Sequence, residues 1–109
     1  MFSSSLIKGT LQTIILKLLY ENKRMYGYEI TKQVEESSQG SIKLTFGAIY
    51  PTLHKLEKGG LLTSENVEVD NRLRKYYSLT SKGREAAVRK IKEYESFARV
   101  MDVIILSNN

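Results

Sequence analysis

The chain has 109 residues, a formal net charge of +5 and no cysteine, and its sequence pI is about 9.5. This length predicts one domain that buries only about two thirds of its unfolded surface, so association with a second copy would stabilise it. The charge favours an acidic partner, either nucleic acid or an anionic membrane surface. The lack of cysteine excludes disulfides and thiolate metal sites, and no apolar run reaches the roughly 18 residues that span a bilayer. We therefore expect a soluble, cytoplasmic protein.

The first predicted element is an amphipathic helix near the N-terminus. Apolar residues recur there at helical spacing and form one wide stripe, which consists of Ile7, Leu11, Ile14, Ile15, Leu18 and Leu19. The stripe is too wide to pack on a single neighbour. Two interpretations stay open: the helix contacts a partner subunit as well as its own core, or it lies fully buried at the centre of one domain.

A second helix is predicted to open at residues 25–30. Gly27 is unfavourable inside a helix, so we expect it to mark the helix start or a close approach by another backbone. Tyr26 and Tyr28 can reach a phosphate through their hydroxyls, but packing is the favoured role. Residues 37–41 then make a turn that leads to a third helix, which gives a helix-turn-helix unit.

The third helix follows a short predicted strand at residues 42–44. Thr45 can cap its start, and Gly59 and Gly60 supply the left-handed geometry that ends it. Its apolar face consists of Phe46, Ile49, Leu53 and Leu56. The polar residues on or beside the opposite face are Thr52, His54, Lys55 and Lys58. Pro51 predicts a loosened turn or a bend, and this stretch alone favours an ordinary core helix with a solvated polar face.

Two strand-like runs, at residues 61–69 and 72–79, predict a β-hairpin. Asp70 and Asn71 separate the runs and tolerate the positive φ of a tight turn. Near this tip the second strand carries three cations, which are Arg72, Arg74 and Lys75. Such cations can bind a DNA backbone, but on an edge strand they also prevent aggregation, and without a preceding helix-turn-helix the second role is preferred.

The longest predicted helix starts at the cap Thr80 and runs to about Leu106. Its apolar residues alternate spacings of four and three, as in the seam of a coiled coil, and these are Ala87, Ile91, Tyr94, Ala98, Met101 and Ile105. Phe97 and Ile104 form a second row that a partner subunit would cover. Folding back on its own domain is less favoured, because three helices and a hairpin already close a core.

The sequence contains no arrangement typical of an active site. His54 is the only histidine, and no cysteine is present to complete a metal site around it. Gly59 and Gly60 lack the Lys-Ser or Lys-Thr of a phosphate-binding loop. We therefore predict no enzymatic activity, no metal and no cofactor.

Three motifs together resemble one family. They are M-Y-G-Y-E-I at residues 25–30, F-G-A-I-Y-P-T-L-H-K-L-E-K-G-G-L-L at residues 46–62 and R-K-Y-Y-S-L-T-S-K-G at residues 74–83. In this order and spacing, over residues 11–83, the chain resembles the PadR family of winged-helix transcriptional regulators. The resemblance implies a mostly α fold with a small β-hairpin. A winged helix-turn-helix DNA-binding domain would occupy residues 1–80 and a dimerisation helix residues 81–109, in one compact unit.

The resemblance also implies a homodimer that binds a near-palindromic operator in double-stranded DNA and acts as a repressor. Residues expected near the major groove are Tyr50, Thr52, His54, Lys55 and Lys58, and those expected on the backbone or minor groove are Arg72, Arg74 and Lys75. The expected dimer interface comprises Leu11, Ile15, Ala87, Ile91, Tyr94, Phe97, Ala98, Met101 and Ile105. Some relatives release DNA when a small aromatic compound binds, which makes Tyr94 and Phe97 candidate effector-pocket residues, although dimer packing is the favoured role for both.

Two other functions remain as alternatives. The first is a dimeric winged-helix module that binds a protein through the same outward helix face, and its binding would depend on apolar residues and little on salt. The second is an enzyme with a site shared between two subunits, which ranks third.

Overall fold

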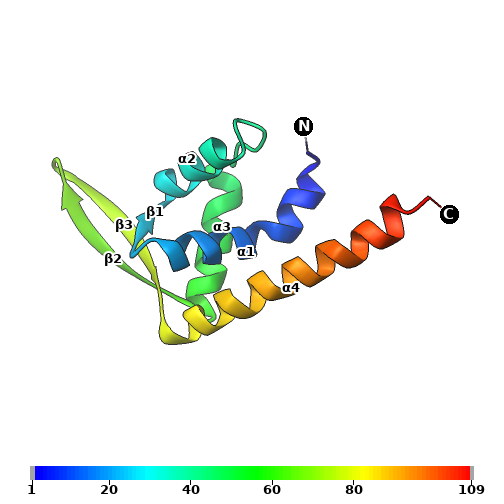
Figure 1. Cartoon of the computed structure of the whole chain (residues 1–109). Coiled ribbons are helices and arrows are strands. Elements are labelled where there is room, and N and C mark those ends of the chain that lie inside the picture. The colour runs from blue at the N-terminus through cyan, green and yellow to red at the C-terminus, as the bar shows by residue number, and fades with distance from the viewer. Residues whose placement is uncertain (1, 109) are drawn as a thin grey trace.

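The computed structural model describes residues 2–108, and these form four helices and a small sheet (Figure 1). The elements in chain order are α1 (Ser4–Glu21), β1 (Met25–Tyr26), α2 (Gly27–Ser37), α3 (Phe46–Lys58), β2 (Leu62–Val69), β3 (Arg72–Leu79) and α4 (Ser81–Leu106). The molecule is elongated, about 60 × 30 × 20 Å, with the β2–β3 hairpin projecting at one end and α4 at the other. The predicted fold class is confirmed: a mostly α winged helix-turn-helix followed by one long helix.

The sheet has three antiparallel strands rather than the predicted two. β1 pairs with β3 through Met25↔Tyr77 and Tyr26↔Tyr76, so the strand order is β1-β3-β2. α2 starts at Gly27, as one interpretation of this glycine predicted, whereas Met25 and Tyr26 belong to β1 and not to the helix.

The short strand predicted before α3 is also absent, and residues 42–44 have no regular structure. The Ser38 hydroxyl accepts a hydrogen bond from the Ile42 N–H at 3.0 Å, which holds this segment in the turn after α2. An amide held by a side chain in this way is not available to a strand partner.

Local chemistry sets the ends of the elements largely as predicted, except that Gly59, the residue after α3, has a right-handed φ of −77° and only Gly60 is left-handed. Thr45 accepts a hydrogen bond from Ala48 N–H at 3.2 Å and Thr80 accepts one from Gly83 N–H at 3.0 Å, so both residues cap helices. Gly60, just after α3, has a φ of 81°. Asp70 and Asn71 have φ values of 50° and 63°, as the tight turn of a hairpin requires.

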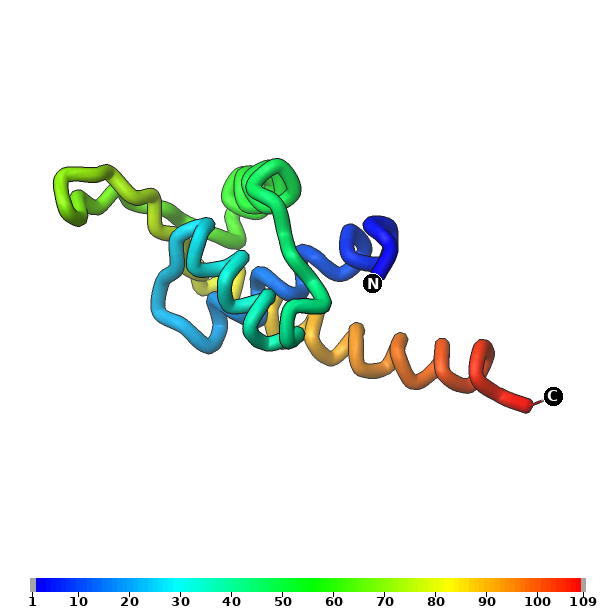
Figure 2. Tube along the Cα trace, turned by 90° about the horizontal axis from the view of Figure 1, so that it is seen from above, coloured from blue at the N-terminus to red at the C-terminus, as the bar shows by residue number. Residues whose placement is uncertain are grey.

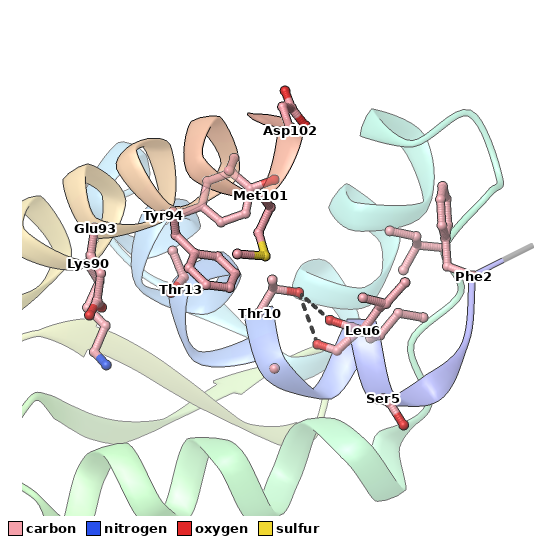
Figure 3. A pocket seen from close by; sticks show the side chains of 15 residues that line it. Phe2, Ser5, Leu6, Thr10, Thr13, Lys90, Glu93, Tyr94, Met101 and Asp102 are labelled. Carbon is pink, nitrogen blue, oxygen red and sulfur yellow. Dashed lines mark hydrogen bonds between the residues drawn. The ribbon is translucent and has the colours of Figure 1, made fainter. Parts of the chain in front are cut away.

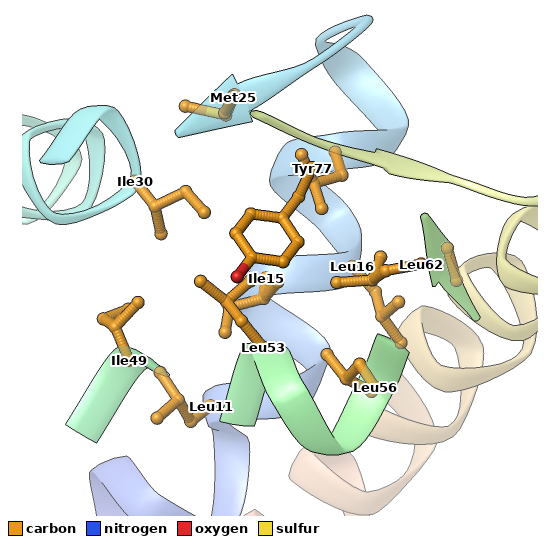
Figure 4. Packing of buried hydrophobic residues seen from close by; sticks show 12 residues of the cluster. Leu11, Ile15, Leu16, Met25, Ile30, Ile49, Leu53, Leu56, Leu62 and Tyr77 are labelled. Carbon is orange, nitrogen blue, oxygen red and sulfur yellow. The ribbon is translucent and has the colours of Figure 1, made fainter. Parts of the chain in front are cut away.

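The core lies between α1, α3 and the sheet, and Tyr77 stands at its centre (Figure 4). Of the apolar stripe of α1, Leu11, Ile15 and Leu19 are buried in this core, whereas Ile7, Ile14 and Leu18 stay partly exposed. Leu11, Ile15 and Ala87 are 4%, 0% and 0% exposed. These three residues have no surface to offer a second subunit, so the prediction that they form a dimer interface is wrong.

The apolar face of α3 is narrower than predicted. Ile49, Leu53 and Leu56 are buried against α1 and Tyr77, whereas Phe46 is 50% exposed. Phe46 is the first residue of α3, so it lies beyond the edge of the core.

α4 packs on α1 in its first half, where Ala86 and Ala87 are buried. Its second half extends away from the body, as the view in Figure 2 shows. Among the apolar side chains there, Phe97, Val100, Val103, Ile104, Ile105 and Leu106 are more than half exposed, whereas Ala98 and Met101 are half-buried. Such a surface is unusual on a monomer and indicates an interaction site.

Candidate nucleic-acid interface

The outward face of α3 carries the cations predicted to meet DNA. His54, Lys55 and Lys58 are exposed on this helix, opposite its buried residues. Neither lysine takes part in an ion pair with any described residue. The helix therefore presents uncompensated positive charge to solvent, as an electrostatic attachment point for a polyanion requires.

Tyr50, predicted to lie near DNA, is also in contact with α2. A Cβ atom built on Gly27 would lie 2.7 Å from the Tyr50 hydroxyl oxygen, so a larger residue at the start of α2 would displace this ring from its present position. The group that lies close to Gly27 is therefore a side chain. One interpretation of this glycine had predicted a neighbouring backbone instead. Along α3 the ring lies 5.8 Å from Phe46 and 6.4 Å from His54, measured between centroids. Tyr50 thus joins the two helices of the helix-turn-helix.

Thr52 is half-buried, and its hydroxyl donates a hydrogen bond to the Ala48 carbonyl at 3.1 Å. The hydroxyl hydrogen is therefore already used within α3. Of the polar side chains predicted on this helix, those of His54, Lys55 and Lys58 form no hydrogen bond or ion pair with any described residue.

The three wing cations differ in their surroundings. Arg72 is exposed beside the hairpin turn. Arg74 lies over the ring of Tyr26, with its guanidinium carbon 4.6 Å from the centroid, and a hydrogen bond with Tyr76 raises the pKa of Arg74. Lys75 lies 3.8 Å from a Glu57 carboxylate oxygen. Arg74 and Lys75 thus connect the hairpin to the body of the protein. Arg72 has no such contact within the described residues and is therefore the wing cation most available to an external anion.

Sequence reasoning missed a cluster of tyrosine and arginine on the face of the sheet that points away from the core. The Tyr26 ring stacks edge-on against Tyr76 at 5.3 Å, and Arg24 lies 4.4 Å from the centroid of Tyr76. Arg24 also binds Glu65 at 2.9 Å. Packing, the favoured role for both tyrosines, is observed: the Tyr28 ring stacks on Tyr26 with 6.3 Å between centroids, although Tyr28 stays 51% exposed. The cluster holds the base of the wing against the start of α2.

An open groove of about 620 Å³ lies between α1 and α4. Figure 3 shows Tyr94 and Met101 of α4 on one side, with Thr10 and Thr13 of α1 opposite. Phe97 also lines the groove. The two residues predicted for an effector pocket are therefore brought to one groove, but on a single chain this groove is open to solvent.

The described residues 2–108 lack two further kinds of feature. No helix among them is both long and apolar enough to cross a membrane. Histidine, cysteine and carboxylate side chains form no group of three or more there that could hold a metal ion.

Comparisons with known proteins agree with this geometry. The sequence profile of the transcriptional regulator PadR-like family matches residues 15–89. The structure of a transcriptional regulator from Clostridium thermocellum superposes with a TM-score of 0.85 at 31% identity, covering 96% of this chain and 99% of that one. A PadR family transcriptional regulator from Eggerthella lenta gives 0.82 at 28% identity, covering 96% and 88%. Transcriptional regulator Rv3488 of Mycobacterium tuberculosis is 42% identical over 65 residues, which are 60% of this chain and 61% of that protein.

Proposed function

We propose that this chain, which belongs to the PadR-like family of transcriptional regulators, binds a near-palindromic operator in double-stranded DNA as a homodimer and represses transcription. The observation that carries the proposal is the exposed, unpaired positive charge of Lys55 and Lys58 on α3. In a helix-turn-helix protein this second helix enters the major groove. As a DNA-binding regulator the chain would act in the cytoplasm.

In the proposed complex each residue of the interface has a distinct role. His54 and Lys55 face base edges, and Lys58 lies near the phosphates that border the groove. Tyr50 and Thr52 lie close to the DNA, but the Tyr50 hydroxyl is turned towards Gly27 of α2 and the Thr52 hydroxyl donates to the α3 backbone. On the wing, Arg72 supplies the main phosphate contact, and Arg74 and Lys75 add charge while they hold the hairpin in place.

The proposed dimer forms through the second half of α4. Its interface residues are Ile91, Tyr94, Phe97, Ala98, Met101 and Ile105, without Leu11, Ile15 and Ala87. Residues 103–106 are four consecutive exposed apolar residues, and together they surround the helix. A single facing helix cannot cover all sides of this helical turn. We therefore place residues 103–106 against both α1 and α4 of the second copy. On α1 of that copy, Leu6 is also exposed and can contact them.

In this arrangement, residues 1–80 would bind DNA and residues 81–109 would dimerise, within one compact unit, as inferred from the sequence. A two-fold axis through the paired α4 helices would put two α3 helices on one side of the dimer. The half-sites of the operator would then be separated by about one helical turn, roughly 34 Å.

The groove between α1 and α4 is where a small aromatic effector would bind in this proposal. Tyr94 and Phe97 offer aromatic faces there, and Lys90, Glu93 and Asp102 offer charged groups at its border. A second subunit would close the open side. The alternative role of the Tyr94 and Phe97 rings is packing in the dimer interface. A titration with phenolic compounds distinguishes the two roles. Unchanged tyrosine fluorescence and unchanged DNA affinity would favour dimer packing.

A titration of duplex DNA tests the proposed function. The double variant Lys55→Ala, Lys58→Ala should bind its selected duplex more weakly, and the slope of log K against log salt should fall by about 0.9 for each phosphate contact removed. Fluorescence anisotropy at several salt concentrations measures both quantities.

Lys92→Ala is the matched control, because Lys92 is an exposed cation on α4, away from α3. It should change neither affinity nor slope. If the α3 double variant binds DNA as wild type does, or if wild-type binding is insensitive to salt, α3 is not the DNA-binding helix, and the protein-binding alternative becomes the better one.

A further inference from the structure

Glu57 is the only acidic residue of α3, the helix proposed to enter the major groove. A carboxylate near a polyanion repels it unless its charge is balanced within the protein. Both carboxylate oxygens of Glu57 have partners in the wing, the β2–β3 hairpin. The Ser64 hydroxyl donates a hydrogen bond to one oxygen at 2.6 Å, and the Lys75 ammonium lies 3.8 Å from the other. Glu57 therefore connects α3 directly to the wing.

The two partners of Glu57 belong to different strands but lie on the same face of the wing. Ser64 of β2 pairs with Tyr77 of β3, and Lys75 lies two residues from Tyr77 on that strand. Because cross-strand partners and residues two apart share a face, Ser64 and Lys75 lie on the face that carries the buried Tyr77 ring. One side chain of α3 thus holds both strands at the base of the wing, where Ser64 pairs with Tyr77.

The opposite face of the same base is held by Arg24. Its guanidinium binds Glu65 of β2 at 2.9 Å and lies 4.4 Å from the ring centroid of Tyr76 of β3. Glu65 and Tyr76 are cross-strand partners, next to the pair that Ser64 makes. The base of the wing therefore lies between Glu57 on one face and Arg24 on the other. Losing the Glu57 contacts would tilt the hairpin rather than release it.

A small tilt at the base of the wing becomes a large displacement near its tip. Arg72 lies five residues from Tyr77 towards the tip, which is about 17 Å along the strand. A tilt of about 10° would move Arg72 by roughly 3 Å, which is the length of a hydrogen bond. A phosphate contact made by Arg72 therefore depends on the angle between the wing and α3.

We propose that Glu57 is a positioning residue: its contacts with Ser64 and Lys75 set the angle at which α3 and Arg72 reach the same operator half-site together. The proposal rests on the proposed DNA-binding function and adds that α3 and the wing bind as one rigid unit. It also reverses the expected sign of a charge effect. Removing Glu57 deletes a negative charge and frees Lys75, which would tighten DNA binding if charge alone mattered. Loss of positioning weakens binding instead.

Glu57→Ala tests this sign on the duplex that the wild-type protein selects from a random library, and it should weaken binding. In the wild-type background, Arg72→Ala should lower the slope of log K against log salt by about 0.9 for each phosphate contact removed. In the Glu57→Ala background, Arg72→Ala should change neither slope nor affinity, because Arg72 no longer reaches its phosphate. Fluorescence anisotropy at several salt concentrations measures both quantities.

Ser64→Ala tests the same contact without any change of charge, and it keeps the proposal testable if Glu57→Ala does not fold. It should weaken binding and reduce the effect of Arg72→Ala. Ser64→Thr retains a hydroxyl and should restore wild-type binding. Ser78→Ala is the matched control, because Ser78 is also half-buried in the hairpin but lies on the face opposite Ser64. It should change neither affinity nor the effect of Arg72→Ala.

Glu68→Ala is the control for the lost carboxylate. Glu68 is exposed on β2, closer to the hairpin turn than Ser64. Its removal should leave DNA affinity unchanged or raise it, because it deletes a negative charge without affecting the Glu57 contacts. Urea denaturation of every variant separates positioning from loss of fold. A variant that is merely less stable would still show the Arg72→Ala effect in its folded fraction.

The outcomes separate the two proposals. If no duplex is enriched by selection, the proposed function fails. If a duplex is enriched but Glu57→Ala binds it at least as tightly as wild type, Glu57 does not position the wing, while DNA binding by α3 stands. The same conclusion follows if Arg72→Ala has no effect in the wild-type background, or if it keeps its full effect with Glu57→Ala or with Ser64→Ala.

Discussion

Tyr77 is the largest fully buried side chain of the chain, and its hydroxyl is a polar group in an apolar core. Around it lie Ile15, Leu53 and Ile49 (Figure 4). Within the described residues the hydroxyl oxygen has no hydrogen-bond partner. The ring therefore contributes packing, while the hydroxyl imposes a desolvation cost on the folded state.

Tyr77→Phe should for this reason stabilise the protein. Removing an unpaired buried hydroxyl is expected to raise the free energy of unfolding by about 1 kcal/mol. Urea denaturation followed by circular dichroism measures the change. A loss of stability instead would mean that the hydroxyl is hydrogen-bonded in solution, for example to a buried water molecule.

The same residue gives stability a dependence on alkaline pH. Burial raises the pKa of Tyr77, and the nearby charge of Glu57 acts in the same direction. Above the ordinary tyrosine pKa of 10.0 the unfolded chain releases this proton while the folded chain keeps it. Wild type should then lose about 1.4 kcal/mol per pH unit from this group until the buried phenol ionises. Tyr77→Phe should lack this loss, so its advantage should widen above that pH.

At the scale of elements, the contact between α4 and the loop after α3 fixes the direction of the long helix. The Thr80 hydroxyl donates to the Gly60 carbonyl at 2.7 Å, and the Thr80 N–H donates to the Leu61 carbonyl at 3.0 Å. Gly83, one turn into α4, lies directly against Leu61. A Cβ atom on Gly83 would be 2.0 Å from the Leu61 carbonyl oxygen. The start of α4 can therefore sit here only because residue 83 is glycine.

Gly83→Ala should be strongly destabilising. The contact is with backbone, which cannot rotate away, so α4 would have to shift and lose the Thr80 hydrogen bonds, at a cost of about 3 kcal/mol. Thermal denaturation measures the effect. Gly9→Ala is the matched control in α1, where an added Cβ meets nothing within 4 Å, and it should stabilise the protein by roughly 0.5–1 kcal/mol. Equal melting temperatures for Gly83→Ala and wild type would contradict the close packing of α4.

An element could be predicted from the sequence when the residues that determine it are its neighbours in the chain. The caps Thr45 and Thr80 and the Asp70–Asn71 turn depend on neighbouring residues, and all were predicted. β1 has two residues, too few for any periodicity, and it exists only because β3 lies beside it. The tyrosine–arginine cluster was missed for the same reason, since the Tyr26↔Tyr76 pairing brings its members together.

The candidate site shows the same limit. Helical spacing indicates that Leu11 and Ile15 are buried but not which chain buries them, and the structure assigns both to their own core. On α3 the pattern identified the outward residues His54, Lys55 and Lys58. It could not show that the Thr52 hydroxyl is bound within the helix or that Tyr50 reaches α2, because these contacts depend on side-chain direction and on the packing of two helices.

At the scale of the whole molecule, the chain has two ends with opposite chemistry. α3 and the wing expose cations, whereas the second half of α4 exposes apolar side chains, with Phe97 58% and Ile105 68% exposed. The distance between the two α3 helices on DNA would be set by how two α4 helices pair. DNA affinity should therefore depend on residues of α4 that never touch DNA.

The double variant Phe97→Lys, Ile105→Lys tests this dependence. Both side chains are exposed on a single chain, so the change should leave the fold of each subunit intact, as circular dichroism can verify. In a dimer each would lose about 1.5 kcal/mol or more of apolar burial in both subunits, and sedimentation should show a monomer. Affinity for a two-half-site duplex should then fall at least about a hundredfold, because the two half-sites are no longer bound together.

Ser96→Lys is the control for the added charge, since Ser96 lies on the side of α4 opposite the seam. It should leave both the dimer and DNA affinity unchanged or slightly raise the affinity through charge. A double variant that still sediments as the wild-type dimer would remove the seam from the interface. A monomeric double variant that binds the two-half-site duplex as tightly as wild type would show that α4 pairing does not set the spacing of the two α3 helices on DNA.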